Sequence, residues 1–297
     1  MTDRRRPSRV WLIDGYYQVF RNYYSMPDLR APDGMPIGAF RGYASTLIKF
    51  LREQHPTHVA VAWDHDMTSF RNEIYADYKA GRVEAPEDLA PQLPLCARVT
   101  ESLGIPLYSL ANFEADDVIA SMTRKLLAKG AEVVIVTADK DLGALVSDRV
   151  SLFDLKREQA QGPDEIRERM GVPPSLVTEF LALVGDAVDN VPGVTGIGAK
   201  SGAALLNHFG SLDAIPADFE LWKEFELRGK QRAYDCFIEG REQLELSRRL
   251  VELQSDLPLE FGLRELQYRG ARREPLEDLL EPLGAASLLE RVDRFAS

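Results

Sequence analysis

Short apolar runs that are each followed within three residues by an aspartate are the sequence feature that most limits the fold. Each run is rich in β-branched or aromatic side chains and free of charge, as strands buried on both faces are. The runs are residues 10–13, 59–63 and 133–136, and the aspartates that follow them are Asp14, Asp64 and Asp139. Because the carboxyl ends of parallel strands share one edge of a sheet, the three acidic loops are expected to converge there.

A fourth apolar run, residues 150–153, and helix-like segments between the runs complete this pattern. The helix-like segments carry apolar side chains at helical spacing and are residues 40–53, 89–103 and 116–128. Gly104 and Gly130 stand where two of these helices should end. Strands that alternate with helices predict an α/β fold with a mainly parallel central sheet flanked by helices.

The pattern changes near residue 163, after which no convincing strand follows. The later segments with helical character are residues 163–170, 174–184, 199–209 and 231–250. We therefore expect an α/β domain of residues 1–162, a helical domain of residues 163–260 and a helical extension of residues 261–297. A polar, irregular stretch at about 70–95 interrupts the first domain, and long connections of this kind are often functional.

Composition and charge place few limits on function. The chain has 297 residues, 45% of them apolar, and no stretch approaches the roughly 20 apolar residues of a membrane helix. Two cysteines far apart, Cys96 and Cys236, favour buried thiols in a reducing compartment, and we expect a cytoplasmic location. The net charge of −11 argues against nucleic-acid binding unless cations offset a cluster of acids and a local basic patch meets the phosphates.

A further acidic cluster, Glu114, Asp116 and Asp117, opens the helix predicted at 116–128. Taken singly, each acid is better explained as a helix cap or a turn residue. Brought together, the acids repel one another unless cations join them, and carboxylates in such numbers suit Mg²⁺ or Mn²⁺. The four histidines form no zinc-ligand pattern, and the sequence contains neither a P-loop nor a nucleophile elbow. The acids therefore point to phosphodiester chemistry with bound divalent ions.

A glycine-rich segment between two predicted helices is the second functional signal. It runs from Gly185 to Lys200 and carries glycines at 193, 196 and 198, which allow a tight turn and close backbone approach. The helix that follows offers free N–H groups to an anion. The segment predicts a hairpin that binds backbone phosphates, which positions a duplex without reading its bases.

Seven stretches of the chain match one protein family, in the family order. They are Leu12-Ile13-Asp14-Gly15, Trp63-Asp64, Ser69-Phe70-Arg71, Tyr78-Lys79-Ala80-Gly81-Arg82, Phe113-Glu114-Ala115-Asp116-Asp117, Thr137-Ala138-Asp139-Lys140-Asp141-Leu142, and Gly185-Asp186 through Lys200. In this combination the chain resembles the 5′→3′ exonuclease and flap endonuclease family, as found in the N-terminal nuclease portion of bacterial DNA polymerase I. The resemblance implies a PIN-like nuclease core, a helical arch and a helix-hairpin-helix (H3TH) domain.

The resemblance also implies a site for two Mg²⁺ ions, for which Mn²⁺ can substitute in the family. The implied ligands are Asp14, Asp64, Glu114 and Asp116 for the first ion and Asp139, Asp141 and Asp186 for the second, with Asp117 and Asp189 at the margin or acting through waters. By the same resemblance, the expected catalytic residues are Lys79, Arg82, Asp14, Asp64, Asp116 and Asp139. The nine acids would then form one catalytic centre.

A DNA-binding surface is a further implication of the resemblance. Its residues are Phe70, Arg71, Tyr78, Lys79, Arg82, Gly193, Gly196, Gly198 and Lys200. Lys79 and Arg82 of the arch would polarise the scissile phosphate, and Tyr78 would stack on a base near the cut. The hairpin would contact duplex phosphates beside a K⁺ ion held by backbone carbonyls.

Three positions depart from the usual family pattern. Val184 stands where threonine is common, Thr195 replaces a frequent lysine, and Tyr16 stands where small or polar residues are common. None of the three removes an implied metal ligand. No polymerase follows Ser297, so the chain resembles a stand-alone member of the family, expected to act as a monomer beside a separate DNA polymerase.

We therefore expect a metal-dependent, structure-selective 5′ nuclease that hydrolyses DNA near junctions of single strand and duplex, in replication and repair. Three alternatives stay open: a scaffold that binds branched DNA with weak or no catalysis, a ribonuclease such as an RNA-primer remover, and an α/β enzyme with an Mg²⁺–nucleotide site. The complete set of nine acids favours catalysis. The sequence leaves open whether the 5′ strand is DNA or RNA, and no membrane partner is expected.

Overall fold

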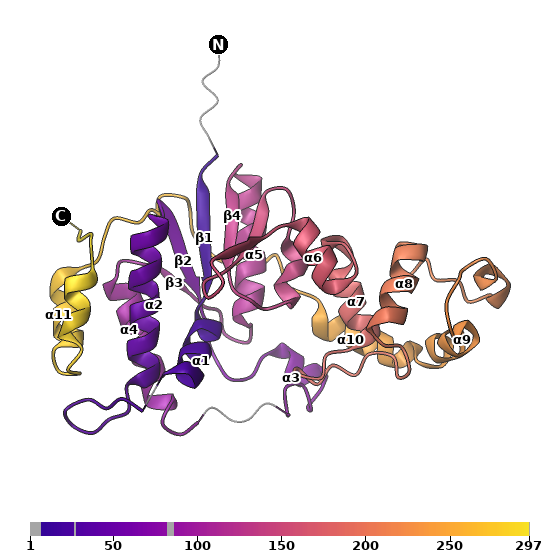
Figure 1. The fold of residues 1–297 in the computed structure, drawn as a ribbon, viewed down its shortest axis with the longest axis horizontal. Coiled ribbons are helices and arrows are strands. Elements are labelled where there is room, and N and C mark those ends of the chain that lie inside the picture. Colours follow the sequence, from indigo (N-terminus) through magenta and orange to yellow (C-terminus); the bar gives the residue numbers. More distant parts are fainter. Residues whose placement is uncertain (1–6, 27, 82–85, 297) are drawn as a thin grey trace, which may run out of the picture.

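A six-stranded sheet lies at the centre of the computed structural model, which describes residues 7–26, 28–81 and 86–296 (Figure 1). The strand order is β3-β2-β1-β4-β5-β6. The strands are β1 (Arg9–Asp14), β2 (His58–Ala62), β3 (Leu107–Tyr108), β4 (Glu132–Val136), β5 (Val150–Asp154) and β6 (Gln159–Gln161). All neighbouring pairs are parallel except β5 and β6, so the predicted, mainly parallel sheet is confirmed.

The sequence predicts four of these strands, β1, β2, β4 and β5, with every boundary within one residue. The strands β3 and β6 are not predicted. One of them has two residues, and the other has the polar sequence Gln-Ala-Gln. Both are edge strands, and neither carries the apolar run on which strand prediction depends.

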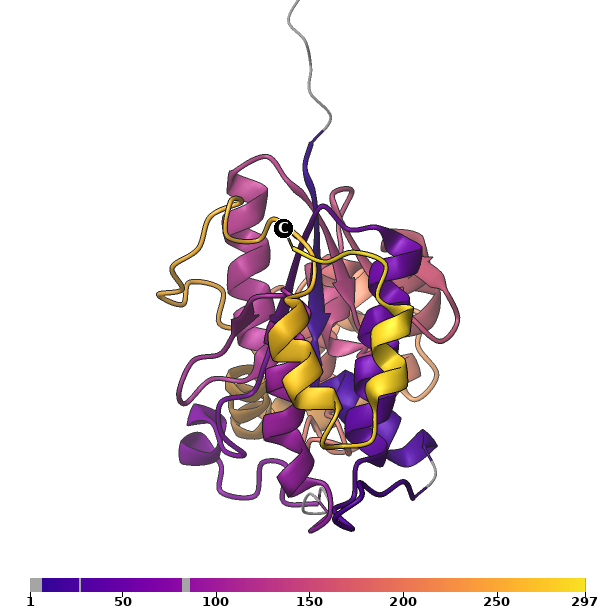
Figure 2. The same ribbon diagram turned by 90° about the vertical axis from the view of Figure 1, so that its left-hand side faces the viewer.

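Alternate side chains of β1 enter the apolar layers on opposite faces of the sheet. Trp11 and Ile13 belong to one buried cluster, whereas Val10 and Leu12 belong to the other. The elements over the Trp11 face are α2 (Gly38–Gln54), α4 (Leu93–Ser102), α11 (Arg273–Leu280) and the 3₁₀ helix η5 (Ala286–Arg291). Figure 2 shows α11 and η5, in yellow, lying outside α2 and α4, so the end of the chain packs back onto its first part.

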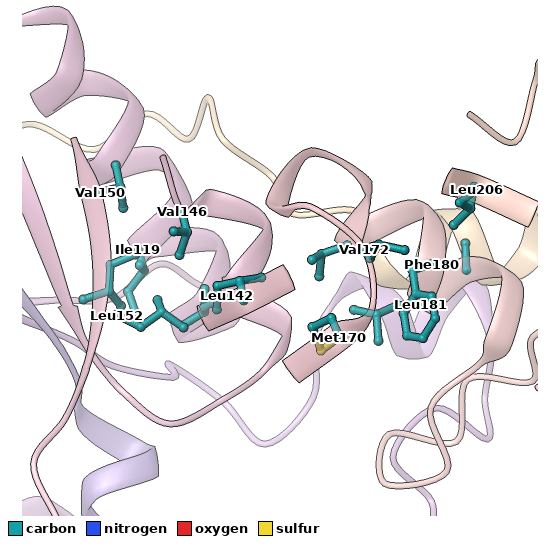
Figure 3. Close-up of a cluster of buried hydrophobic side chains, with 14 of the residues drawn as sticks. Ile119, Leu142, Val146, Val150, Leu152, Met170, Val172, Phe180, Leu181 and Leu206 are labelled. Carbon is teal, nitrogen blue, oxygen red and sulfur yellow. The ribbon is translucent and has the colours of Figure 1, made fainter. Parts of the chain in front are cut away.

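The Val10 face is covered by α5 (Ala115–Ala128), and the apolar cluster continues from there into the helical part of the chain. Figure 3 shows Leu152 of β5 near one end of this cluster and Leu206 near the other. The helical elements are α6 (Pro163–Met170), η3 (Pro174–Leu176), α7 (Val177–Val184), α8 (Ala199–Phe209), η4 (Phe219–Trp222), α9 (Lys230–Glu239) and α10 (Arg241–Val251). One buried cluster therefore spans the sheet and the helices.

Three predicted helices differ from the structure where proline or glycine occurs. The helix expected at 174–184 opens as the 3₁₀ helix η3, which has a proline in its first turn, before α7 begins at Val177. The helix expected at 89–103 opens as the 3₁₀ helix η1 (Ala90–Gln92) before α4, and each element has a proline in its first turn, where no backbone N–H is needed. The single helix expected at 231–250 is wrong, because α9 and α10 divide at Gly240. A Cβ at Gly240 would lie 2.7 Å from Val194 Cγ1, so the chain turns where it packs closely.

The helix α1 (Gly15–Ser25) follows β1 directly and is not predicted. Asp14 caps it, since the side chain of Asp14 accepts the Tyr17 N–H at 3.1 Å. Apolar side chains at helical spacing could have revealed α1, and they are Tyr16, Val19, Phe20 and Tyr23. α1 connects the sheet to α2 and packs against α2.

The segment expected as a helical arch contains one short α-helix, α3 (Phe70–Ile74), among its described residues up to η1. Residues 82–85, with Arg82 among them, lie outside the described residues. In the parts of the chain that the structure covers, no helix is both long and apolar enough to span a membrane.

Candidate active site

The carboxyl edge of the sheet gathers the aspartates that follow the strands. β1 lies between β2 and β4, so Asp14, Asp64 and Asp139 follow three neighbouring strands. Thr137 joins two of these acids, because its hydroxyl donates to Asp14 Oδ2 at 3.0 Å and accepts the Asp139 N–H at 3.1 Å. The three acidic loops therefore converge, as their position after parallel strands predicts.

Asp14 lies at the centre of this group and is buried, with 5% of its surface exposed. Burial raises the pKa of Asp14 to about 7; the Tyr17 N–H opposes the rise, and the charges of Asp64 and Asp139 add to it. A carboxylate whose pKa is raised this far lacks compensating positive charge. The surroundings of Asp14 therefore favour a cation.

The first turn of α5 brings another acid to the same edge. The Ala115 N–H donates to Asp64 Oδ1 at 2.9 Å, which joins the start of α5 to the loop after β2. Burial, followed by the charges of Asp139 and Asp14, raises the pKa of Asp116 well above its usual range. Asp116 thus lies among the aspartates that end the strands.

Glu114 lies at the outer side of the group and has four side-chain partners among the described residues. Its Oε1 accepts from Ser69 Oγ at 3.0 Å and lies 2.9 Å from Lys79 Nζ. Its Oε2 accepts from the Tyr78 hydroxyl at 3.2 Å and from Arg71 Nη1 at 3.4 Å. Burial opposes ionisation, but Lys79 and Arg71 outweigh it and lower the pKa of Glu114, so its carboxylate stays charged.

A second group of acids forms where the loop after β4 meets the loop after α7. The Asp141 N–H donates to Asp139 Oδ1 at 2.9 Å, and Lys140 Nζ donates to Asp141 Oδ1 at 3.0 Å and to Asp186 Oδ2. Burial and the charge of Asp139 raise the pKa of Asp141 to about 6, although Lys140 opposes the rise. At Asp186 burial is outweighed by Lys140 and the Val188 N–H, which lower the pKa. The second group therefore already contains a cation, the ammonium of Lys140.

Asp117 is placed differently from the other predicted ligands. Its side chain is fully buried, and its two oxygens lie 2.7 and 2.8 Å from the guanidinium nitrogens of Arg71. The same oxygens accept the N–H groups of Glu114 and Gln254. Arg71, predicted to bind DNA, is 2% exposed and also donates to the Leu250 carbonyl. In this structure the two buried side chains face each other.

The residues predicted for the arch lie against the helical part of the chain. Lys79 has a left-handed backbone with φ of 58°, and its N–H donates to the Asp189 carbonyl at 2.9 Å. Its Nζ also lies 3.7 Å from the Asp189 carboxylate. Tyr78 is 5% exposed and packs with Val191, so its ring is not open for a base to stack on. Arg82 lies outside the described residues, and its predicted role stays a prediction.

Phe70 opens α3 at the base of the same segment. Its ring is partly buried and lies 5.6 Å from the Phe113 ring, centroid to centroid, and its N–H donates to the Asn112 carbonyl at 3.0 Å. The Arg71 guanidinium carbon lies 4.6 Å from the Phe70 centroid. Phe70 thus fixes the start of the segment on the loop before α5.

The predicted phosphate-binding hairpin joins α7 to α8. Gly193 has a φ of 60°, and a Cβ there would lie 2.3 Å from the Gly185 nitrogen, so only glycine fits. The Gly193 N–H is taken by Ser247 Oγ of α10 at 2.9 Å and is not available to a phosphate. Of the hairpin residues predicted to bind DNA, Gly196, Gly198 and Lys200 are exposed. The start of α8 is therefore the part of the hairpin that is open to a ligand.

Three residues within the matching stretches gain a role that the sequence did not assign. The hydroxyl of Thr137 donates to Asp14, the hydroxyl of Ser69 donates to Glu114, and the ammonium of Lys140 bridges two acids. Each lies one or two residues from a predicted site residue in sequence. That nearness is the available signal, and it is weak because hydroxyls and lysines are also common on ordinary surfaces.

The donor set of the candidate site fits divalent cations that prefer oxygen ligands, since all nine predicted ligands are acids. Within residues 7–26, 28–81 and 86–296, no three acidic, histidine or cysteine side chains already surround one point closely enough to hold a metal ion. Lys79 contacts Glu114 of the first group, and Lys140 contacts Asp141 and Asp186 of the second.

Two family models together account for most of the chain. Residues 9–171 match the model described as 5′-3′ exonuclease, N-terminal resolvase-like domain, and residues 172–274 match the 5′-3′ exonuclease, C-terminal SAM fold. A resolvase-like α/β core of the PIN type joined to a helical domain is thus the class of protein that the fold and the acidic edge define. The chain belongs to the 5′-3′ exonuclease family, and the resemblance drawn from its sequence motifs is confirmed.

Curated relatives include proteins of similar length and much longer ones. A 5′-3′ exonuclease of Aquifex aeolicus is 34% identical over 286 residues, which cover 96% of this chain and 96% of that protein. DNA polymerase I of Rhizobium leguminosarum is 36% identical, over 97% of this chain and 28% of that protein. The thermostable DNA polymerase I of Thermus thermophilus is 39% identical, over 95% of this chain and 33% of that protein. The chain thus spans a third or less of these polymerases.

Solved structures of low identity share the fold. A T5 5′-exonuclease described with bound divalent zinc ions has a TM-score of 0.67 at 21% identity, and the match covers 95% of this chain and 98% of that one. Human GEN1, in complex with Holliday junction DNA, has a TM-score of 0.62 at 16% identity, over 95% of this chain and 71% of that one. Both likenesses concern the fold alone.

Proposed function

We propose that this chain is a structure-selective 5′ nuclease that hydrolyses DNA phosphodiesters near junctions of single strand and duplex. The observation that carries the proposal is the set of acids at the carboxyl edge of the sheet. Asp14, Asp116 and Asp141 are crowded and desolvated enough that their pKa values rise. Such crowding destabilises a protein that binds no cations. It is useful where cations and a phosphate must be held together.

Two divalent ions, Mg²⁺ or Mn²⁺, are the cofactors that we propose. The residues that would hold them are Asp14, Asp64, Glu114 and Asp116 in the first group and Asp139, Asp141 and Asp186 in the second. When bound, such ions activate water and stabilise the negative charge of a phosphoryl transition state. The T5 exonuclease, which shares the fold, is described with divalent metal ions, which supports the choice of cofactor class.

Two of the nine predicted ligands take supporting roles in our proposal. Asp117, whose oxygens are engaged by Arg71 and by backbone N–H groups, would fix the start of α5 and thereby the positions of Glu114 and Asp116. Asp189 lies beside Lys79 at the margin of the site. These two acids would orient neighbours and would not bind an ion directly.

Lys79 would neutralise charge on the reacting phosphate. Its ammonium lies 2.9 Å from Glu114 Oε1, at the margin of the first carboxylate group, and its side chain is partly exposed. A cation held there favours the charge that develops on a phosphoryl group during hydrolysis. We keep Arg82 as a second candidate for this role on the grounds of its sequence motif.

The helical part would hold the duplex. We propose that residues 163–260 act as the duplex-binding domain and that the exposed start of α8, with Gly198 and Lys200, contacts backbone phosphates beside a K⁺ ion. The strand to be cut would pass near residues 70–95. The GEN1 structure, which shares the fold, is described with junction DNA, which supports DNA as the partner class.

The decisive test is cleavage of a 5′-labelled double-flap DNA by the whole protein in Mg²⁺ and in EDTA. Asp139→Ala should reduce turnover at the junction at least ~100-fold, because it removes a ligand of the proposed ions. Asp148→Ala is the matched control. Asp148 is an exposed aspartate just before β5, at the edge of the sheet opposite to the candidate site. Binding of the same DNA in Ca²⁺ should be retained by both variants.

Other outcomes of this test would contradict the proposal. Tight binding of the flap by the wild-type protein without cleavage in Mg²⁺ or Mn²⁺ would favour a scaffold for branched DNA. Cleavage that survives both EDTA and Asp139→Ala would exclude the proposed metal site. A parallel substrate with an RNA 5′ strand shows whether the enzyme cuts RNA as well as DNA. A substrate with a 3′ flap shows whether cleavage is specific for the 5′ end.

A further inference from the structure

Lys140 connects two acids that belong to different parts of the chain. Asp141 opens the 3₁₀ helix η2 (Asp141–Leu145) after β4, whereas Asp186 lies in the loop after α7. Lys140 Nζ donates to Asp141 Oδ1 at 3.0 Å and to Asp186 Oδ2. The side chain of Asp186 is 7% exposed and that of Asp141 is 25% exposed, so the pair is largely shielded from water. Lys140 thus bridges the resolvase-like part and the helical part.

The remaining contacts of these acids explain why the bridge matters. Asp186 Oδ1 accepts the Val188 N–H at 2.8 Å, and the Asp141 N–H donates to Asp139 Oδ1. No other side-chain cation within the described residues contacts Asp141 or Asp186 at salt-bridge distance. Without a cation, two shielded carboxylates from separate loops would repel each other across the junction of the two parts.

We propose that Lys140 is a built-in counter-ion that holds Asp141 and Asp186 together and leaves the pair when a divalent ion binds there. This inference rests on the proposed function, because it requires the second carboxylate group to bind an ion. An ammonium and a divalent cation cannot share two carboxylates at contact distance without strong repulsion. The Lys140 side chain is 36% exposed, so its ammonium has a route to water.

Lys140 is therefore a positioning residue that affects ion affinity in two opposite ways. It keeps the second group assembled, which lowers the cost of forming the site. It also competes with the ion for Asp186 Oδ2, which lowers the apparent affinity of the site for the ion. Because Lys140 must be displaced, the competition is expected to dominate the measured affinity once the fold is intact.

The test is calorimetric titration of Mn²⁺ into the whole protein without DNA, for wild type, Lys140→Met and Lys140→Arg. Lys140→Met should bind one Mn²⁺ about tenfold more tightly than wild type, since it removes the competing charge. Lys140→Arg keeps the charge and should stay within about threefold of wild type. Lys49→Met is the matched control, because Lys49 also contacts two acids, Glu53 and Glu158, but on the outer surface of α2.

Thermal unfolding in EDTA and in saturating Mn²⁺ gives a second measurement that does not depend on activity. Lys140→Met should lose more stability than Lys49→Met in EDTA and should recover to the wild-type midpoint in Mn²⁺, because the ion replaces the lost charge. A Lys140→Met protein that stays unfolded in Mn²⁺ overturns the inference. Unchanged or weaker Mn²⁺ binding by a folded Lys140→Met protein overturns it as well.

The same titrations separate this inference from the proposed function. If wild type binds Mn²⁺ and Asp139→Ala does not, the proposed metal site stands, and the Lys140→Met result alone decides the counter-ion role. If wild type and Asp139→Ala give identical titrations, the proposed metal site and the counter-ion role are both overturned.

Discussion

Arg71 and Asp117 form a two-point ion pair inside the protein, with Nη1 2.7 Å from Oδ2 and Nη2 2.8 Å from Oδ1. Their side chains are 2% and 0% exposed. Arg71 also donates to the carbonyls of Leu250 and Glu252 at the end of α10. The pair thus joins α3, the first turn of α5 and the end of α10 at one buried point.

Removal of Arg71 should destabilise the fold strongly. Arg71→Met leaves the Asp117 carboxylate buried without its partner, and we expect the free energy of unfolding to fall by about 3–5 kcal/mol in urea titrations. Arg71→Lys should recover little, because an ammonium cannot make the two-point contact. Arg30→Met is the control, since Arg30 pairs with Asp28 on the surface and should change stability by about 1 kcal/mol at most. A loss at Arg71 no larger than at Arg30 would refute this account.

The response of stability to divalent ions should depend on pH. The folded pKa values of Asp14, about 7, and Asp141, about 6, lie above the usual 3.8. Between pH 3.8 and about 7, these two carboxyl groups therefore hold more protons in the folded protein than in the unfolded chain. In EDTA the contribution of these groups to stability is therefore present at low pH and is lost as pH rises through about 7.

Ion binding requires the deprotonated carboxylates, so the rise in melting temperature caused by Mn²⁺ should grow between pH 5.5 and 8. Differential scanning calorimetry at several pH values, with EDTA or Mn²⁺, measures both effects. Asp14→Asn, which does not titrate, should flatten the dependence in EDTA. An Mn²⁺ effect that is equal at pH 5.5 and pH 8 would contradict the prediction.

Lys79→Met should lower turnover on a flap substrate by about 100- to 1000-fold, because it removes a cation from the margin of the first carboxylate group. Binding of the flap in Ca²⁺, measured by fluorescence anisotropy, should weaken much less. Lys129→Met is a suitable control, since Lys129 caps the opposite end of α5 and contacts the Phe261 carbonyl. If binding and turnover fall equally, Lys79 holds DNA and does not act on the reacting phosphate.

Gly193→Ala should damage both the fold and duplex binding. The φ of 60° is strained for alanine, and the new Cβ would meet the Gly185 nitrogen at 2.3 Å, so we expect a loss of about 3 kcal/mol in the free energy of unfolding. Gly34→Ala is the control, because Gly34 also has a positive φ, of 90°, but nothing lies within 4 Å of its Cβ position. The difference between the two variants isolates the close contact inside the hairpin. Equal losses would show that backbone strain alone matters.

The sequence predicts the central sheet well because buried strands leave a strong local pattern. Val133 and its neighbours are apolar on both faces, and the aspartates that follow mark the edge where the acids meet. The division of the 231–250 helix at Gly240 has no comparably clear signal, because it depends on the approach of Val194, which lies far away in sequence. Tertiary contacts of this kind override helical periodicity.

The candidate site shows the same limit. Its acids are evident from their spacing, yet spacing alone does not distinguish Asp116, which lies among the other aspartates, from Asp117, which faces Arg71; only the family resemblance set Asp117 at the margin. The two are adjacent on α5, and rotation by one residue along a helix turns a side chain by roughly 100°. The burial of Tyr78 is likewise decided by Val191 and α10, which its own sequence neighbourhood does not contain.

The apolar cluster that joins the sheet to the helices passes through the boundary between the two matched family models. Met170 and Val172, on either side of that boundary, are both members of the cluster (Figure 3). Neither matched segment therefore contains a complete hydrophobic core by itself. The two segments should unfold in a single cooperative transition. A fragment that ends at residue 171 would display the apolar surface that the helices now cover, and it would tend to aggregate. The unit that folds cooperatively is therefore larger than the segment that either family model matches.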